Sequence, residues 1–248
     1  MSLPNAEEIR LAQQIQQSFA PRKERILAHN LQYAARSISV HTLNGDYYDF
    51  IPVGPGRIGL LIADISGKGL PAALLVASLR AFIISQERSM FNDMRDLARK
   101  ANELLYQSTP AHVFASLFLG LYEERERRLT YVNCGQVPPL LLEADGLVHK
   151  LGTTAPVIGI LEDWYASAHE VELHPGDTLV MLTDGITEAM NRTGQQFGYD
   201  RLIGVANSCS GMKPAEMADT LIKAVNNFSG FNQQDDLTVV VARVHPEV

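Results

Sequence analysis

Apolar and polar residues alternate along many short segments of the chain, and turn residues separate these segments. Alternation with a period of two is typical of β-strands that are buried on one face. It predicts strands at residues 48–53, 57–63, 114–123, 129–134, 139–143, 147–151, 167–173, 178–183 and 237–244. A Gly-Pro-Gly turn joins the first two strands as a hairpin, and the pattern is strand-like from about residue 31.

Helical segments occur in pairs between the runs of strands. One helix starts at Pro71 and reaches about residue 86, and a second follows to about residue 107. Two more are predicted at 199–208 and 213–228. A regular strand–helix–strand alternation is missing, which argues against a doubly wound sheet. The pattern therefore predicts an α+β fold in which helices cover antiparallel sheets.

A further helix is predicted at residues 5–20, ahead of the strands. Asn5 is a suitable N-cap and Pro21 ends the helix. The helix carries an apolar stripe formed by Ile9, Ala12, Ile15 and Phe19. Two interpretations are open: the helix packs on its own domain, or it pairs with a partner helix in a homodimer and links to an upstream module. We therefore divide the chain into a linker or regulatory helix at 1–21 and a domain at 22–248.

The composition is that of an ordinary globular protein, with 46% hydrophobic and 20% charged residues among 248. The formal net charge of −7 argues against general binding to nucleic acid or to anionic membranes. No apolar run is long enough for a transmembrane helix, and no signal-peptide pattern is visible. The two cysteines, Cys134 and Cys209, cannot build a disulfide framework, which favours a reducing cytoplasm.

Several acidic residues lie at the margins of strongly apolar strands. They are Asp46, Asp64, Asp184, Asp235 and Asp236. A single acid of this kind is usually a surface turn residue, and Asp184-Gly185 is also a hairpin-turn signal. If folding brings the strand ends together, two carboxylates ~4 Å apart repel by roughly 4 kcal/mol at an effective dielectric of about 20. Such a cluster requires protons or cations.

The chemistry of these acids points to phosphate esters. Oxygen ligands without His or Cys favour Mg²⁺ or Mn²⁺ over zinc, and paired cations of this kind activate water for attack on phosphate esters. Other catalytic schemes lack their motifs, because the sequence contains no His-Glu-x-x-His, no Gly-x-Ser-x-Gly and no P-loop frame. Lys68, between two glycines, is expected to shape its loop and to place positive charge near a phosphate.

Five segments of the chain resemble the motifs of one known family. They are 45-GDYYDFIPV-53, 64-DISGKGLPAALLVASLRA-81, 131-YVNCGQVPPLLL-142, 182-LTDGITEAMN-191 and 235-DDLTVVVAR-243. The chain resembles bacterial PP2C-type (PPM) metal-dependent serine/threonine phosphatases of the SpoIIE-like or RsbU-like branch. Five motifs in family order are stronger support than one Asp-Gly pair.

The resemblance implies a four-layer αββα sandwich of two antiparallel sheets flanked by helix pairs, with two Mn²⁺ or Mg²⁺ ions at one edge. In this family pattern Asp64 bridges both metals, the backbone carbonyl of Ile65 binds the first metal, and Asp46 lies near that metal. Asp184 and Asp235 match the acids that hold the second metal.

Two neighbouring acids receive different assignments from the same resemblance. Asp236 is an alternative to Asp235, because a shift of one residue between adjacent acids is open. Asp49 also belongs to a family motif, and we expect it to be structural or to lie behind the metal ligands.

The implied activity is hydrolysis of phosphoserine or phosphothreonine on a regulatory protein, such as an anti-sigma-factor antagonist, by a water that two metals activate. An upstream sensory or receiver domain is also implied. The alternative is a weakly active or inactive phosphatase-fold module that binds a phosphoregulator. Asn44, in place of a more usual glycine, and Gln136, in place of a more usual histidine, motivate this alternative. No substrate-binding residue is assigned, and Arg36 stands in a family-like context without a role.

Overall fold

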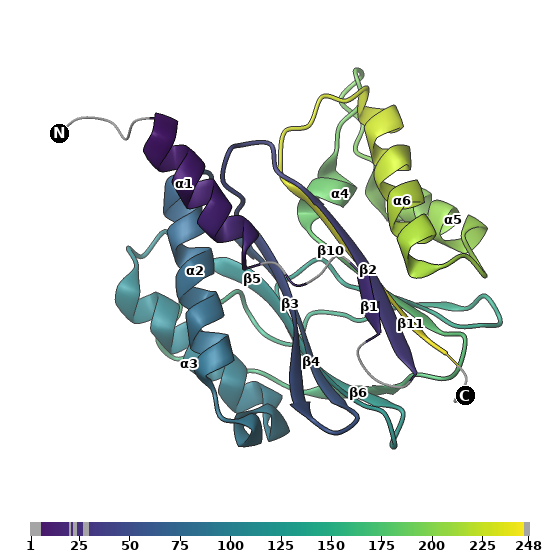
Figure 1. Ribbon diagram of the computed structural model, residues 1–248, viewed down its shortest axis with the longest axis horizontal. Helices are drawn as coiled ribbons and strands as arrows, with labels where there is room; N and C mark the ends of the chain where they lie inside the picture. The colour runs from purple at the N-terminus through teal and green to yellow at the C-terminus, as the bar shows by residue number, and fades with distance from the viewer. Residues whose placement is uncertain (1–5, 20, 22–23, 27–29, 246–248) are drawn as a thin grey trace.

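The computed structural model describes residues 6–19, 21, 24–26 and 30–245, and two antiparallel sheets form its centre (Figure 1). One sheet has the strand order β3-β4-β5-β6-β9, and we call it sheet B. Its strands are β3 (Asp46–Gly54), β4 (Arg57–Ile65), β5 (Ala115–Glu123), β6 (Arg128–Cys134) and β9 (His169–Glu172).

The second sheet, sheet A, has the order β1-β2-β11-β10-β7-β8. Its strands are β1 (Glu24–Ile26), β2 (Leu31–Ile38), β7 (Leu140–Leu142), β8 (Val148–Lys150), β10 (Thr178–Leu182) and β11 (Leu237–Val244). All the strands expected from the alternation are present, and their ends agree with the predicted ends to within two residues. β1 is an addition that the pattern did not predict.

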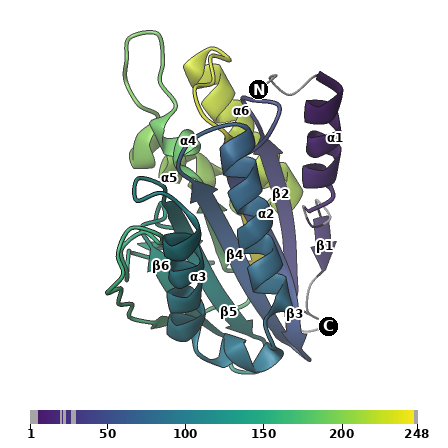
Figure 2. The same ribbon diagram turned by 90° about the vertical axis from the view of Figure 1, so that its left-hand side faces the viewer.

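Helices cover the outer face of each sheet (Figures 1 and 2). On sheet B they are α2 (Leu70–Ser85), η1 (Arg88–Asn92) and α3 (Met94–Ser108); on sheet A they are α4 (Asp184–Glu188), α5 (Gly198–Ser208) and α6 (Pro214–Ser229). The predicted α+β fold with an αββα layer order is therefore confirmed. In the described part of the chain, no helix combines the length and apolarity that crossing a bilayer requires.

Alternation within each strand supplies the cores between the layers. In β4, Leu60 and Ile62 face the other sheet, whereas Leu61 and Ala63 face the helices of sheet B. The two sheets meet through contacts such as the stacked rings of Tyr33 and Phe50, whose centroids are 3.9 Å apart. Burial of each large apolar side chain contributes about 1.5–3 kcal/mol, so these layers fix where the strand ends lie.

The first helix, α1 (Ala6–Gln17), is shorter than predicted, and the expected N-cap Asn5 lies outside the described residues. None of its residues is buried. Gln16 of this helix contacts the domain: its side chain donates to the Asn44 carbonyl at 2.6 Å and accepts from the Asn44 N–H at 2.9 Å. Phe19 follows α1 in the sequence, and the centre of its ring lies 5.0 Å from the guanidinium of Arg80 in α2.

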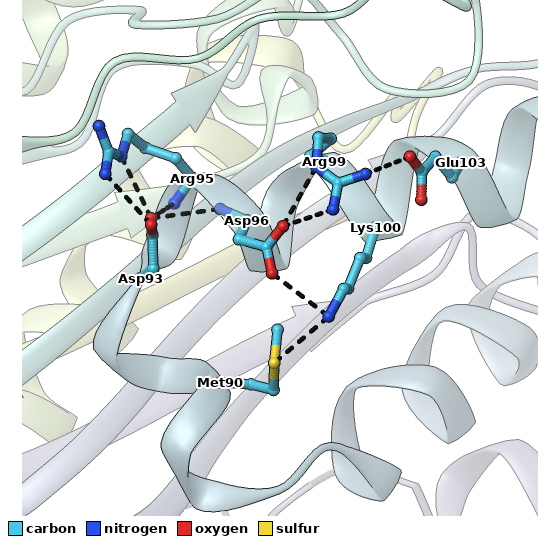
Figure 3. Close-up of polar contacts among 7 residues, drawn as sticks. All are labelled: Met90, Asp93, Arg95, Asp96, Arg99, Lys100 and Glu103. Carbon is cyan, nitrogen blue, oxygen red and sulfur yellow. Dashed lines mark hydrogen bonds and ion pairs between the residues drawn. The ribbon is translucent and has the colours of Figure 1, made fainter.

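The start of α3 illustrates how a surface helix is fixed by local charge (Figure 3). Asp93 caps the helix by accepting hydrogen bonds from the backbone N–H groups of Arg95 and Asp96, at 3.0 and 3.3 Å. One turn later, Arg99 joins Asp96 to Glu103. These ion pairs are exposed and each contributes less than about 1 kcal/mol, so the cap is the stronger local determinant.

Asp184-Gly185 does not form a hairpin turn. The two residues open the short helix α4, which contacts β11. A Cβ atom built on Gly185 would overlap the carbonyl oxygen of Asp236. Glycine is therefore required here for close approach of two backbones, and not for a left-handed turn, because its φ is not positive.

We predict that Gly185→Ala destabilises the fold by more than about 2 kcal/mol, because the added methyl must push the Asp236 backbone away from α4. The matched control is Gly204→Ala in α5, where the surrounding space is open. That change should stabilise the chain by about 0.5–1 kcal/mol. Urea unfolding followed by circular dichroism measures both, and equal stabilities of the two variants would contradict this account of the contact.

Candidate metal centre

The ends of several central strands lie at one edge of the sandwich. Asp46 begins β3 and is paired directly with Asp64, near the end of β4. Tyr48 and Ile62, two residues away on the same strands, belong to the core between the sheets. Side chains two residues apart share a face, so both acids point towards the other sheet. At this edge sheet A contributes the end of β10 and the start of β11, with Asp184, Asp235 and Asp236 adjacent to them.

Hydroxyl groups join the two sheets at this edge. Thr183 Oγ1 donates to Asp46 Oδ2 at 2.8 Å, and the same oxygen accepts from the Thr238 N–H at 3.1 Å. Both threonines are fully buried, and Asp46 is 7% exposed. Asn44 orders the approach to β3, because its Oδ1 accepts from the Asp46 N–H at 2.8 Å. A carboxylate of one sheet is thus fixed by a side chain of the other.

Asp235 and Asp236, the adjacent acids before β11, have different hydrogen-bond partners. Asp236 accepts backbone N–H groups on both oxygens, from Val40 at 2.8 Å and from Gly45 at 2.9 Å. It therefore fastens the loop between β2 and β3. Asp235 is about half exposed, and its Oδ2 lies 3.0 Å from the ammonium of Lys68. Unlike the two oxygens of Asp236, the Oδ2 atom of Asp235 accepts from a side chain and from no backbone N–H group among the residues described.

Electrostatics show that the acids converge. Burial raises the pKa of the Asp64 carboxyl, and the negative charges of Asp46, Asp184, Asp235 and Asp236 raise it further. Four of the five acids expected from the sequence are therefore close enough to influence the fifth, Asp64.

Two further acids of this group have raised pKa values for related reasons. Burial also raises the pKa of Asp46, against the opposing hydrogen bonds of Thr238 and Thr183. For Asp184, burial and the charges of Glu188 and Asp235 raise the pKa, and the charge of Lys68 opposes them.

The donor set fits hard divalent cations, because it consists of carboxylates with no His or Cys among them. The expected backbone ligand, the carbonyl of Ile65, is close to Gly45: a Cβ on that glycine would lie 3.4 Å from it. Within the described residues, however, no three His, Cys, Asp or Glu side chains are arranged tightly enough to hold a metal ion. Thr183 and Lys68 occupy carboxylate oxygens of Asp46 and Asp235 instead.

Two other residues considered from the sequence, Asp49 and Arg36, have polar partners of their own. Asp49 accepts from Tyr47 Oη at 2.7 Å and from the Phe50 N–H at 2.8 Å, and it supports β3. Arg36 forms a two-point ion pair with Asp219 of α6, at 2.6 and 2.9 Å, and ties β2 to that helix. These contacts are consistent with a structural role for Asp49, and they give Arg36 a partner in α6.

The two departures from the family pattern have local explanations. Asn44 does not adopt a positive φ, so the chain here does not need glycine's freedom. Gln136 is buried, and its Oε1 accepts from Ser116 at 3.1 Å and from the Val137 N–H at 2.9 Å. Ser116 is paired with Asp64, so Gln136 belongs to the polar layer beside the acids. Its Nε2 has no hydrogen-bond partner among the residues described.

The sequence did not predict the roles of Thr183 and Thr238, or the hydrogen bonds by which Asp236 holds the loop between β2 and β3. The available signal was position: Thr183 directly precedes Asp184, and Thr238 lies two residues after Asp236. Threonine in a strand is ordinarily explained by β-propensity, so this signal became interpretable only when the two strand ends met.

Comparison with known proteins identifies the family. The family model of stage II sporulation protein E (SpoIIE) matches residues 54–245. Protein IcfG of Synechocystis sp. is 26% identical over 270 residues, covering 95% of this chain and 41% of IcfG. The phosphoserine phosphatase RsbU of Bacillus subtilis is 27% identical, covering 95% of this chain and 70% of RsbU. The chain thus spans less than half the length of IcfG.

Solved structures agree on the fold. The PP2C domain of SiaA from Pseudomonas aeruginosa matches with a TM-score of 0.83 and 20% identity, covering 96% of each chain. The catalytic domain of the phosphatase PstP, in complex with two manganese ions, matches with a TM-score of 0.66 and 18% identity, over 88% of this chain and 99% of that domain. The family match covers residues 54–245, which is more than half of the chain and includes β4 to β11 and all the acids of the group except Asp46. The chain therefore belongs to the SpoIIE family.

Proposed function

We propose that this chain hydrolyses phosphoserine or phosphothreonine with the help of two divalent cations, Mn²⁺ or Mg²⁺. The observation that carries the proposal is the convergence of five acids from both sheets at one edge: Asp46 is paired with Asp64, and Thr183, next to Asp184, donates to Asp46. The charges of the other four acids raise the pKa of Asp64. Buried like charges are retained in a fold when they serve a site, because they cost stability. The activity named for RsbU and the manganese ions of PstP support the same conclusion.

The acids of the two sheets have complementary roles in this proposal. Asp46 and Asp64, with the carbonyl of Ile65, would hold a cation on the side of sheet B; Asp184 and Asp235 would hold one on the side of sheet A. Bound cations supply positive charge that acidifies water and neutralises phosphate oxygens. Asp236 holds the loop before β3 in place, so that Asp46 enters the site at a fixed position.

The substrate we propose is a phosphorylated regulatory protein, such as an anti-sigma-factor antagonist. The name of RsbU, a phosphoserine phosphatase, supports phosphoserine as the group that is hydrolysed. We also propose control by an additional sensory or receiver domain; IcfG, of which this chain covers 41%, has length available for such a domain. Cys134 and Cys209 are both unpaired and buried, as is usual in a reducing compartment, and we propose a cytoplasmic location.

The N-terminal segment 1–21 is proposed as a separate regulatory element that mediates a homodimer. On α1, Leu11 and Ile15 are four residues apart and therefore share one face of the helix. They are 57% and 52% exposed. A second copy of the same helix would cover this face by antiparallel or parallel pairing.

Asp184→Asn should lower the hydrolysis of para-nitrophenyl phosphate and of a phosphoserine peptide at saturating Mn²⁺ by at least about 100-fold, because it removes a ligand charge. Asp163→Asn, at an exposed position outside the acid group, is the matched control and should retain full activity. Chelation should abolish the activity of both. Metal binding without any turnover would instead support the phosphoregulator-binding module.

The metal-free chain should lose stability as pH rises from about 5 to 8. Burial raises the pKa values of Asp46 and Asp64, so the folded state keeps protons that the unfolded state has already released. Stability then falls with pH in this window. Urea midpoints in chelator would measure the slope, and Asp64→Asn should flatten it. If stability changes with pH equally in the wild type and in Asp64→Asn, the raised pKa assigned to Asp64 is wrong.

Leu11→Asp combined with Ile15→Asp should convert a dimer into a monomer in sizing chromatography, because it places charge on the proposed helix interface. Leu147→Asp changes a similarly exposed leucine in a remote hairpin and should leave the dimer intact. A wild-type chain that elutes as a monomer would remove the dimer from the proposal.

A further inference from the structure

Lys68 connects the two halves of the acid group across 167 positions of sequence. It lies in the loop between β4, which carries Asp64, and α2. Its ammonium donates to the carbonyl of Gln234 at 2.6 Å and to Asp235 Oδ2 at 3.0 Å. The side chain of one sheet's loop thus neutralises an acid that belongs to the other sheet.

The backbone of the loop is built to place this lysine. Gly67 and Gly69 flank it with φ values of 95° and 70°, which side-chain-bearing residues rarely adopt. No atoms crowd either glycine, so the glycines are needed for backbone direction and not for close packing. The two glycines therefore allow the backbone conformation that directs the Lys68 side chain towards Asp235.

The contact between Lys68 and Asp235 contributes little to stability. The two side chains are 45% and 49% exposed, and exposed ion pairs are weak. A weak pair at an acid of the proposed metal centre can be exchanged readily for a divalent cation, which binds a carboxylate more strongly than an ammonium does.

An ammonium released from Asp235 does not have to leave the site. Lys68, Gly185, Glu188 and Asp235 line one cavity of about 180 Å³. The lysine therefore borders open space beside the acids. Because lysine is a flexible, strongly hydrated cation that commonly binds phosphate, a phosphate group in this space is its natural alternative partner.

We propose that Lys68 is a two-position cation: it occupies Asp235 in the metal-free chain, and it binds the phosphate group of the substrate once a divalent cation has taken Asp235. This inference rests on the proposed function and assigns the phosphate-binding residue that the sequence left open. It makes Lys68 a competitor of the second cation and a ligand of the substrate.

The two roles predict changes of opposite sign in Lys68→Gln, whose amide retains a donor for the Gln234 carbonyl but lacks the charge. The dissociation constant for Mn²⁺, measured by titration calorimetry, should fall about two- to fivefold because the competitor is gone. The dissociation constant of inorganic phosphate for the Mn²⁺-loaded chain should rise about tenfold or more. KM for a phosphoserine peptide should rise in parallel.

Two variants serve as controls. Lys223→Gln removes an exposed lysine of α6 and should change neither constant. Lys68→Arg keeps the charge and should keep phosphate binding within about threefold of the wild type. Thermal unfolding in chelator establishes that each variant folds.

A purely structural role for Lys68, as an anchor of the Gln234 loop, predicts weaker Mn²⁺ binding in Lys68→Gln, and that result would overturn the proposal. Unchanged phosphate binding, or an equal loss in Lys68→Arg and Lys68→Gln, would overturn it as well. Both calorimetric constants are measurable without turnover. An inactive wild-type chain that shows the two opposite shifts would therefore refute the proposed hydrolysis and still support the placement of Lys68.

Discussion

Repulsion between carboxylates gathered at one edge of the sandwich is the constraint on which the rest of this structure depends. Asp46 and Asp64 arrive from sheet B, and Asp184 and Asp235 arrive from sheet A. Neither sheet alone assembles the group. Apolar packing between the sheets must therefore supply the free energy that keeps the strand ends together, and the stacked Tyr33 and Phe50 are part of that packing.

The partners of these acids differ with their burial. Asp46 is buried and is paired with the neutral hydroxyl groups of Thr183 and Thr238, which place no second charge in the interior. Asp236 receives two backbone N–H groups. Asp235 is half exposed and forms an ion pair with the ammonium of Lys68. A charged partner at an exposed acid moves at small cost, whereas the neutral contacts around Asp46 keep that acid in place.

Much of the architecture follows from local pattern, because alternation identifies which residues of a strand face each side. Leu60 to Ala63 in β4 is such a case, and it led directly to the layered α+β fold. The candidate acids were also recognisable, from their position at strand margins and from the ordered motifs. What local pattern cannot give is the pairing of distant strand ends. The bond from Thr183 to Asp46 spans 137 positions, and the split in role between Asp235 and Asp236 depends on a loop that is nearly 200 positions away.

Gly185 shows how the fold accommodates this site. The residue after Asp184 must lie against the Asp236 carbonyl, and a side chain there would separate α4 from β11. The same short distance that excludes a methyl group brings the carboxylates of Asp184 and Asp235 within electrostatic reach of one another. Close backbone approach thus raises the electrostatic cost of the metal-free chain. It also creates the density of negative charge that paired divalent cations require, so stability without cations and affinity for them are set by one contact.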